Sequence, residues 1–299
     1  RVARRPSPDA IQREGAGVIH RREFITHMAG GLLGGLYVAQ NGLGNFIQGG
    51  ANQIGLQLYT VRRELEKDFE GTLASVAGIG YREVEFAGYY ERTPQQVKAI
   101  LDKHNLTSPS AHTQLQGLRQ NLDKLLEAAH VIGHRYLVLA YLSAEERKTL
   151  DDYKRVIETL NQAGETCHRA GVQLAYHNHD FEFPPLGGVV PYDLMLKETR
   201  ADLVKMELDL YWITKAGQSP SKYFAAHRGR FALAHVKDMD NTPKRFFTEV
   251  GRGVIDFKQL LPQAKKAGVK HFFVEQDETP GPPLDSIKIS YDYLHGLRW

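Results

Sequence analysis

Short β-branched and aromatic runs alternate with longer amphipathic stretches from Ile54 to the end of the chain. This alternation predicts a parallel sheet with helical crossovers, because parallel neighbours cannot be joined by a tight turn. The predicted strands cover residues 54–59, 83–87, 108–113, 136–142, 172–179, 204–212, 231–238 and 271–277. The predicted helices lie near residues 68–78, 94–104, 117–132, 149–169, 191–199, 219–227, 256–267 and 284–296.

The length of the chain and the turn after its first strand distinguish between the two main parallel folds. A (β/α)₈ barrel typically needs roughly 250 residues, which is close to the length available after residue 52. The main alternative, a doubly wound open sheet, usually carries a glycine-rich turn after its first strand to bind phosphates. The segment after Tyr59 reads TVRREL and contains no glycine. We therefore predict a single-domain (β/α)₈ TIM barrel over residues 52–299.

The first 51 residues differ in composition from the rest of the chain. Residues 1–20 are polar and basic, and the pair Arg21-Arg22 precedes Phe24 and a weakly apolar, glycine-rich run over residues 28–39. A basic region followed by an apolar region is typical of a twin-arginine export signal, and this run is too short to span a bilayer. We expect residues 1–51 to be a signal segment and linker, and the protein to be exported to the periplasm without a stable membrane anchor. A disordered basic tail is the alternative.

The charge of the chain argues against nucleic acid binding, and its cysteine content excludes an internal disulfide. The net charge is +3, and much of the basic excess lies within residues 1–22. The barrel region therefore lacks a basic surface suited to a phosphate backbone, which argues against a nucleic acid partner. The single cysteine, Cys167, excludes an internal disulfide and falls in a predicted helix, where an inert packed thiol is expected.

Imidazole and carboxylate groups end four consecutive predicted strands. In order, these strand ends carry His177 with His179, Asp209, His235 with Lys237, and Glu275. Alternate residues of a strand share a face, so these side chains are expected to converge at the C-terminal mouth of the barrel. A lone histidine or glutamate at a strand end is more often a structural group. The presence of such residues at the ends of four successive strands is what favours a metal site. Mixed nitrogen and oxygen ligands suit Mn²⁺, Co²⁺, Zn²⁺ or Fe²⁺, and Mg²⁺ remains open. We predict one divalent metal bound by His177, Asp209, His235 and Glu275.

Further strand-end residues are candidates for catalysis and substrate binding. Catalytic roles are predicted for Glu275, His177, Glu85 and Lys237. Glu85 is interpreted as a second base or a ligand of sugar hydroxyls, with a structural carboxylate as the alternative. Lys237 could polarise a carbonyl or form a salt bridge. Substrate contacts are predicted for His112, His179, Tyr59, Trp212, Phe86 and Lys237, where aromatic rings would pack on the C–H faces of a sugar.

Six sequence segments carry a resemblance to a known family. They are IGLQLYTVR (54–62), YHNHDFEF (176–183), LDLYW (208–212), AHVKDMD (234–240), VGRGVIDF (250–257) and VEQDE (274–278). In this order they resemble the xylose isomerase-like TIM barrel superfamily, in its sugar phosphate isomerase/epimerase branch. The resemblance covers about residues 52–299.

The resemblance implies one metal ligand from each of strands five to eight, usually Glu, Asp, His and Glu. Asp209, His235 and Glu275 match the last three, whereas His177 stands where the family usually has glutamate. Epimerases of the family use two glutamates on opposite faces of the substrate carbon. His177 therefore puts a symmetric two-carboxylate epimerisation in question, although a metal-stabilised enediolate remains feasible.

Three functions follow as hypotheses. The first is a metal-dependent sugar or keto-sugar isomerase/epimerase that acts through an enediolate. The second is a lyase or dehydratase that acts on a 3-keto-glycoside or an inosose with a histidine base. The third is an exported sugar-binding barrel without catalysis. The resemblance also implies a homodimer or homotetramer, with a small sugar as the substrate.

Overall fold

The computed structural model describes residues 54–299, and the predicted signal and linker, residues 1–51, lie outside the described residues. The long strands are β1 Ile54–Gln57, β2 Glu83–Phe86, β3 Thr107–Thr113, β4 Tyr136–Leu139, β5 Gln173–His177, β6 Val204–Asp209, β7 Phe231–Val236 and β10 His271–Val274. They close into a parallel barrel in the order β1-β10-β7-β6-β5-β4-β3-β2. The predicted (β/α)₈ barrel is confirmed.

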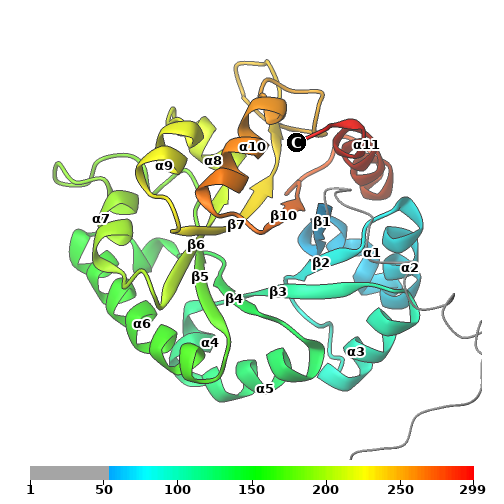
Figure 1. Cartoon of the computed structure of the whole chain (residues 1–299), viewed down its shortest axis with the longest axis horizontal. Helices are drawn as coiled ribbons and strands as arrows, with labels where there is room; N and C mark the ends of the chain where they lie inside the picture. Colours follow the sequence, from blue (N-terminus) through cyan, green and yellow to red (C-terminus); the bar gives the residue numbers. More distant parts are fainter. Residues whose placement is uncertain (1–53) are drawn as a thin grey trace, which may run out of the picture. The chain divides into compact units, whose positions relative to one another are not determined.

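Helices surround the barrel on its outside (Figure 1). They are α1 Arg62–Lys67, α2 Phe69–Ile79, α3 Pro94–Lys103, α4 Leu115–Gln120, α5 Leu122–Ile132, α6 Leu150–Arg169, α7 Pro191–Glu198, α8 Leu210–Lys215, α9 Pro220–Ala226, α10 Phe257–Ala267 and α11 Pro283–Gly296. Two short 3₁₀ helices, η1 Leu58–Val61 and η2 Ala144–Glu146, follow β1 and β4. Within residues 54–299, no helix combines the length and apolar character needed to cross a bilayer.

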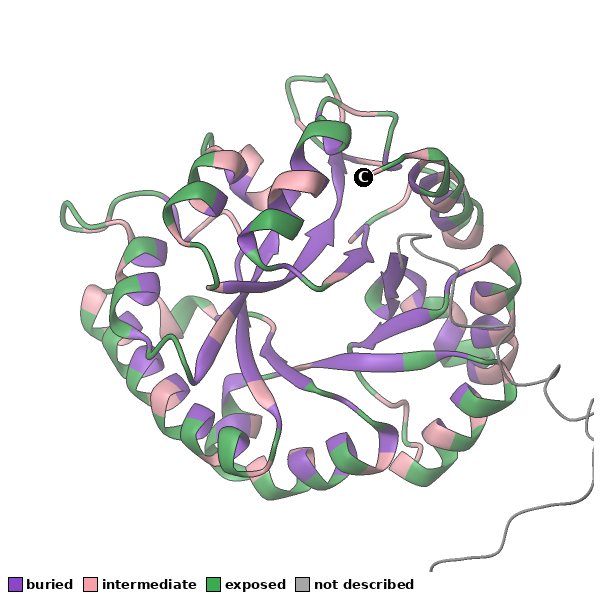
Figure 2. Cartoon of the chain, in the orientation of Figure 1, coloured by how far each residue is buried: buried purple, intermediate pink, exposed green. Residues whose placement is uncertain are grey.

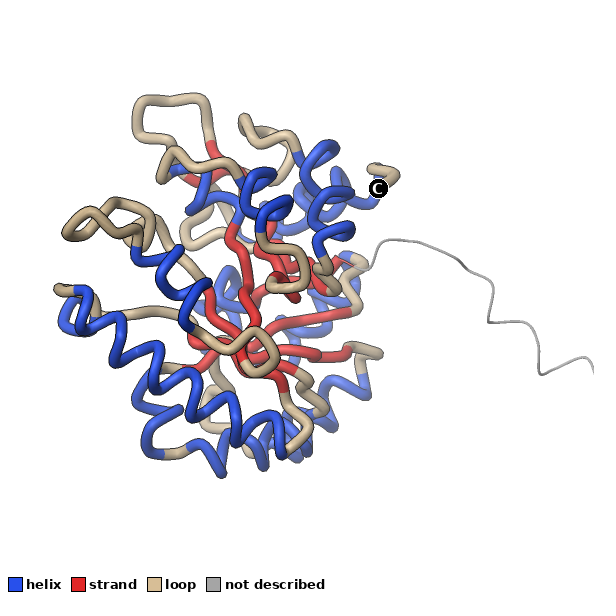
Figure 3. Tube along the Cα trace, turned by 60° about the vertical axis from the view of Figure 1, so that its left-hand side comes forward, coloured by secondary structure: helices blue, strands red, loops and turns tan. Residues whose placement is uncertain are grey.

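The strands are buried on both faces, while the helices expose their outer faces (Figure 2). The side view in Figure 3 shows the strands at the centre with helices around them. The main core lies between strands and helices and includes Leu56, Val84 and Leu208. A smaller cluster containing Val138, Leu233 and Phe273 shares the inward strand faces with the residues of the mouth. Layers of inward side chains thus fill the barrel below the site.

Gly55 leaves space for the Phe273 side chain inside the barrel. A Cβ atom on Gly55 would lie 2.4 Å from Cδ1 of Phe273. Because β1 carries no side chain at this position, the Phe273 ring can pack inside the barrel against the β1 backbone.

The sequence prediction was wrong about Phe86. Glu85 faces the barrel interior, so the next residue must face the helices. Phe86 is fully buried there, with its ring centroid 6.2 Å from that of Phe69 and 5.3 Å from that of Tyr89. Phe86 is therefore a core residue and does not form a wall of the substrate pocket.

The predicted helix 117–132 is divided in two. Asn121 ends α4 and precedes α5 with φ −135° and ψ 24°, outside the helical range. Asparagine favours such junctions, since its short polar side chain competes with helical hydrogen bonding. A further element absent from the sequence prediction is the antiparallel ribbon of β8 Asp238–Met239 and β9 Phe247–Thr248.

Asp238 anchors the loop that follows this ribbon. Its Oδ2 accepts hydrogen bonds from the backbone N–H groups of Gly251 and Gly253, at 2.9 and 3.0 Å. Its Oδ1 accepts from Met239 and Ile255, at 2.8 and 3.1 Å. These hydrogen bonds join the segments AHVKDMD and VGRGVIDF in the folded protein.

Gly253→Ala is expected to lower the free energy of unfolding by about 1–3 kcal/mol, the usual cost of overpacking. A Cβ atom at Gly253 would lie 2.3 Å from both Asp238 Oδ1 and the Met239 carbonyl oxygen. Urea unfolding followed by circular dichroism measures the change. Gly281→Ala is the matched control, because a Cβ there meets no atom within 4 Å. Equal stability of the two variants would contradict the packing argument.

Candidate active site

The four predicted metal ligands meet at the mouth of the barrel. We call His177, Asp209, His235 and Glu275 the mouth set; one donor atom from each lies within 4.8 Å of the others. His177 Nε2 is 3.3 Å from Asp209 Oδ2, and His235 Nδ1 is 2.9 Å from Glu275 Oε2. Because their strands are neighbours in the barrel, these side chains converge on one point although successive members are 26 to 40 residues apart in sequence.

Hydrogen bonds orient both imidazoles of the mouth set. His177 Nδ1 lies 3.1 Å from the Ala140 carbonyl oxygen, which can only accept, so Nδ1 carries the hydrogen. Nε2 of His177 faces Asp209 Oδ2 and is the nitrogen left to bind a metal. His235 Nε2 lies 2.8 Å from Glu85 Oε2, which leaves Nδ1 to face Glu275. Such contacts fix the tautomer of metal-binding histidines, so the mouth set fits a divalent metal.

Asp209 is positioned by its place between β6 and α8. Its Oδ1 caps α8 by accepting from the N–H groups of Tyr211 and Trp212, at 2.9 and 2.8 Å. The Asp209 N–H donates to Asn178 Oδ1 at 3.0 Å. One carboxylate oxygen is therefore held by the backbone, and Oδ2 points into the site.

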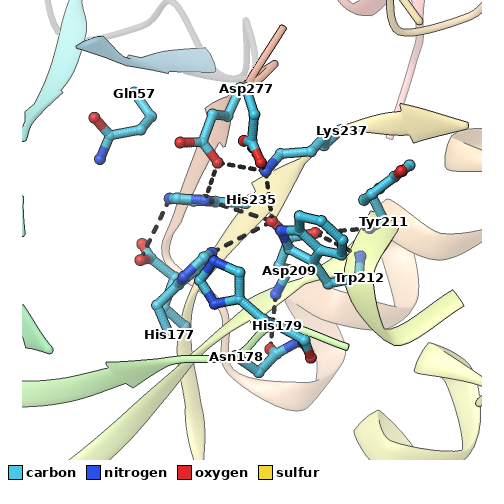
Figure 4. Close-up of polar contacts among 12 residues, drawn as sticks. Gln57, His177, Asn178, His179, Asp209, Tyr211, Trp212, His235, Lys237 and Asp277 are labelled. Carbon is cyan, nitrogen blue, oxygen red and sulfur yellow. Dashed lines mark hydrogen bonds and ion pairs between the residues drawn. The ribbon is translucent and has the colours of Figure 1, made fainter. Parts of the chain in front are cut away.

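Lys237 places a buried cation beside the mouth set (Figure 4). Its Nζ lies 2.7 Å from Glu275 Oε2, 2.7 Å from Asp277 Oδ1 and 3.1 Å from Asp209 Oδ2. Burial alone would lower the pKa of Lys237, but the charges of Asp209, Asp277 and Glu275 raise it well above its ordinary value. The side chain therefore stays an ammonium and donates hydrogen bonds to these carboxylates.

A second polar layer lies beneath the mouth set. We call Glu85, His112, Glu207 and His235 the floor set; their donor atoms also lie within 4.8 Å of one another. Glu85 is fully buried and accepts hydrogen bonds from Gln57 Nε2 at 2.8 Å and from Ser110 Oγ. His112 Nε2 lies 2.8 Å from Glu207 Oε2. The structure thus places Glu85 and His112, predicted to meet the substrate, in contact with other side chains of the barrel.

The two floor glutamates differ in their environment. Burial raises the pKa of Glu85, but His112 and His235 outweigh it and hold that pKa well below its ordinary value. Burial and the neighbouring charge of Glu85 raise the pKa of Glu207. Glu207 Oε1 is also buried and has no hydrogen-bond partner among the described residues.

Aromatic side chains surround His179 next to the mouth set. Its ring centroid lies 5.0 Å from that of His177 and 5.3 Å from that of Trp212. His179 Nδ1 and Trp212 Nε1 are buried and have no hydrogen-bond partner within residues 54–299. Buried polar atoms without partners are rare, so these two atoms are candidates for contact with a polar ligand. Tyr59, another predicted contact, is 42% exposed and lies under the Arg62 guanidinium.

The loop that carries His179 is held by a buried carboxyl group. Glu182 Oε2 accepts from the His179 N–H at 2.9 Å, and Glu182 Oε1 accepts from the Tyr176 hydroxyl at 2.5 Å. Burial raises the pKa of Glu182 to about 8. The folded protein therefore keeps a proton that the unfolded chain releases near pH 4.5.

Glu182→Gln is expected to flatten the pH dependence of stability between about pH 4.5 and 8. A raised carboxyl pKa contributes stability that is present below the unfolded pKa and is lost as pH rises through the folded pKa. The wild type should therefore lose up to about 1.4 kcal/mol per pH unit from this group alone. Urea unfolding at several pH values measures the slope, with the exposed Glu127→Gln as control. A slope unchanged by Glu182→Gln would refute the assignment.

Sequence reasoning missed four polar residues of the site. Asp277 and Glu207 could have been found from parity, because each lies two residues from a predicted ligand on the same strand end. Gln57 and Asn178 carried no comparable signal. They contact Glu85 and the Asp209 backbone only because of how neighbouring strands pair.

Comparison with known proteins agrees with this geometry. The family model of the xylose isomerase-like TIM barrel matches residues 73–296. The chain belongs to the xylose isomerase-like TIM barrel family. It is similar to inosose dehydratase of Lacticaseibacillus casei, with 20% identity over 273 residues that cover 77% of this chain and 89% of that protein.

Two solved structures are similar to the chain. A sugar phosphate isomerase/epimerase from Parabacteroides distasonis superposes with a TM-score of 0.72 and 26% identity, over 83% of this chain and 95% of the other. The IOLI protein with a bound zinc atom superposes with a TM-score of 0.65 and 15% identity, over 80% and 95%. The second likeness shows the shared fold alone. The predicted family is confirmed.

Proposed function

We propose that this protein is a divalent-metal-dependent lyase or dehydratase that removes the α-proton of a keto-sugar or keto-cyclitol and expels a β-oxygen. The observation that carries the proposal is the hydrogen bond from His177 Nδ1 to the Ala140 carbonyl oxygen. An imidazole that binds a metal through Nε2 and donates from Nδ1 has no lone pair left for proton transfer. A glutamate at this position would keep a second oxygen for that purpose.

Asp209 is also a carboxylate of the mouth set, but its Oδ1 accepts from backbone N–H groups and its Oδ2 contacts Lys237. Glu275 is therefore the carboxylate that remains as a base. Epimerisation needs proton acceptors and donors on both faces of the substrate carbon, whereas elimination can proceed with one base and one acid. Glu275 Oε2 contacts His235 and Lys237, so we assign Oε1 as the proton acceptor. His177, which the sequence suggested as a base, acts as a ligand in this proposal.

Lys237 supplies the acid. The α-proton passes to Glu275, the carbon–carbon double bond forms, and the β-carbon–oxygen bond breaks. The leaving oxygen takes a proton from Lys237 Nζ and departs as water or an alcohol. Glu275 then releases its proton to solvent and the Lys237 amine takes one up from solvent, which restores the starting state. A bound divalent metal supplies Lewis-acid stabilisation of the negative charge on the carbonyl oxygen.

The other site residues fit a polyhydroxylated substrate. The unpartnered His179 Nδ1 and Trp212 Nε1 supply hydrogen-bonding atoms beside His177, and the Trp212 ring offers an apolar surface. Similarity to inosose dehydratase supports elimination from a keto-cyclitol. Similarity to the sugar phosphate isomerase/epimerase supports the alternative, in which the same first step leads to an isomer or epimer.

The products separate these two reactions. The metal-loaded protein is incubated with a keto-inositol and, separately, with a 3-keto-glucoside, while ultraviolet absorbance and proton NMR spectra are recorded. An enone absorbance that grows with release of water or the alcohol supports the lyase. An isomer or epimer without an enone would favour the alternative, and an unchanged substrate in both cases would refute both enzymes.

Cell location remains a separate proposal. We propose that the Arg21-Arg22 segment directs export to the periplasm, as the order of its basic and apolar regions suggests. Fractionation of cells that express the full chain, beside an Arg21→Lys, Arg22→Lys double variant, tests it. Equal amounts of both proteins in the periplasm would contradict export by this route.

A further inference from the structure

The floor set forms a ring of alternating nitrogen and oxygen atoms. His112 Nε2 lies 2.8 Å from Glu207 Oε2 and 3.2 Å from Glu85 Oε2. His235 Nε2 lies 3.3 Å from Glu207 Oε2 and 2.8 Å from Glu85 Oε2. All four sides of this ring are therefore similar in length. Apart from His112, which is slightly exposed, the set is fully buried.

These lengths match the spacing of ligands around one metal ion. Bonds of about 2.1 Å place neighbouring ligand atoms roughly 3.0 Å apart at right angles and roughly 3.4 Å apart at tetrahedral angles. Hydrogen bonds explain the ring less completely. The two imidazole nitrogens hold at most one hydrogen each, so each hydrogen would be shared between two carboxylate oxygens. The buried, unpartnered Glu207 Oε1 is a further oxygen of the floor set with no hydrogen to accept.

We propose that the floor set binds a second divalent transition-metal ion. His235 then bridges two sites, with Nδ1 directed to the mouth set and Nε2 to the floor set. An imidazole with a cation on each nitrogen gives up its remaining proton to solvent, and the two positive charges favour that loss. Two nitrogen and two oxygen ligands suit Zn²⁺, Co²⁺, Ni²⁺ or Cu²⁺ better than Mg²⁺ or Ca²⁺.

The second ion has a definite physical effect. It neutralises two glutamates that are fully buried at the centre of the barrel, and it fixes the His235 ring that both sites share. The inference goes beyond the proposed function, because the elimination requires only the mouth set and Lys237.

Metal stoichiometry tests the inference. The full chain is freed of metal with a chelator, titrated with Zn²⁺ and separately with Co²⁺, desalted, and assayed by mass spectrometry. The wild type should hold two equivalents per chain. Glu207→Gln should hold one, and Asp209→Asn, which disables the mouth set instead, should also hold one. His112→Gln is a second floor variant in case Glu207→Gln does not fold, as judged by circular dichroism.

Two results would decide against the inference. If the wild type never exceeds one equivalent of metal and Glu207→Gln binds the same amount, hydrogen bonds alone hold the floor set together. The proposed function would survive that result, because the mouth ion would be present. A wild type without any bound metal would refute both the second metal site and the proposed function. Anomalous scattering from Co²⁺-grown crystals gives an independent check, since the inference requires a peak between Glu85 and Glu207.

Discussion

Glu275→Gln is expected to lower kcat/KM by about 10³-fold, the usual contribution of a positioned general base. Glu275 is the carboxylate that accepts the α-proton in our account. An amide cannot accept that proton. Steady-state kinetics by enone absorbance measures the loss, and metal content measured in parallel separates lost catalysis from lost ligation.

Glu278→Gln is the matched control for this variant. Glu278 lies three residues further along the same strand end, where it is about half exposed and pairs with Arg62 at 3.2 Å. Its substitution should change kcat/KM by less than about threefold, because exposed ion pairs contribute little. A Glu275→Gln protein that retains its metal and near-wild-type turnover would exclude Glu275 as the base.

Lys237→Met is expected to lower the free energy of unfolding of the metal-free protein by about 3–5 kcal/mol. Removing one partner of a buried charge network leaves the others uncompensated, and here Asp209, Glu275 and Asp277 would lose their shared cation. The loss should be smaller once metal is added, since a bound cation also offsets these carboxylates. Turnover should fall in either case, because the leaving oxygen loses its proton donor.

Denaturant unfolding with and without metal measures both effects. Lys288→Met is the control, because Lys288 pairs with Asp292 on the exposed side of α11. That pair should contribute no more than about 1 kcal/mol. If Lys237→Met were as stable as Lys288→Met in metal-free protein, the buried ammonium would not be the counter-ion of the mouth set.

The fold could be predicted from the sequence because the pattern repeats. Each unit shows the change from strand to helix spacing, and the absence of glycine after Tyr59 argued against an open sheet. Two-residue strands have no period to detect, so the ribbon of β8 and β9 was not predicted. The break at Asn121 was missed because the apolar pattern continues across it.

The mouth set could be predicted because strand ends of neighbouring units must meet. The floor set required the register between strands, which sequence spacing does not give. His177 pairs with Glu207, and Asp209 pairs with His235, so Glu207 lies one layer deeper than Asp209. Phe86 was assigned wrongly because its position at a strand end was considered without its parity relative to Glu85.

Hydrogen exchange at carbon tests the central claim most directly, since removal of an α-proton precedes both elimination and isomerisation. The wild type is incubated in D₂O with a keto-inositol and a 3-keto-glucoside, with added Co²⁺ or Mn²⁺ or with a chelator, and the α-proton signal is followed by NMR. The account predicts that, in the presence of metal, the α-proton signal or the substrate itself is lost with at least one of these sugars. With chelator, or in Glu275→Gln, the α-proton signal and the substrate should both persist. Persistence of the signal under all conditions, with saturable binding of both sugars, would contradict the account and leave a sugar-binding barrel.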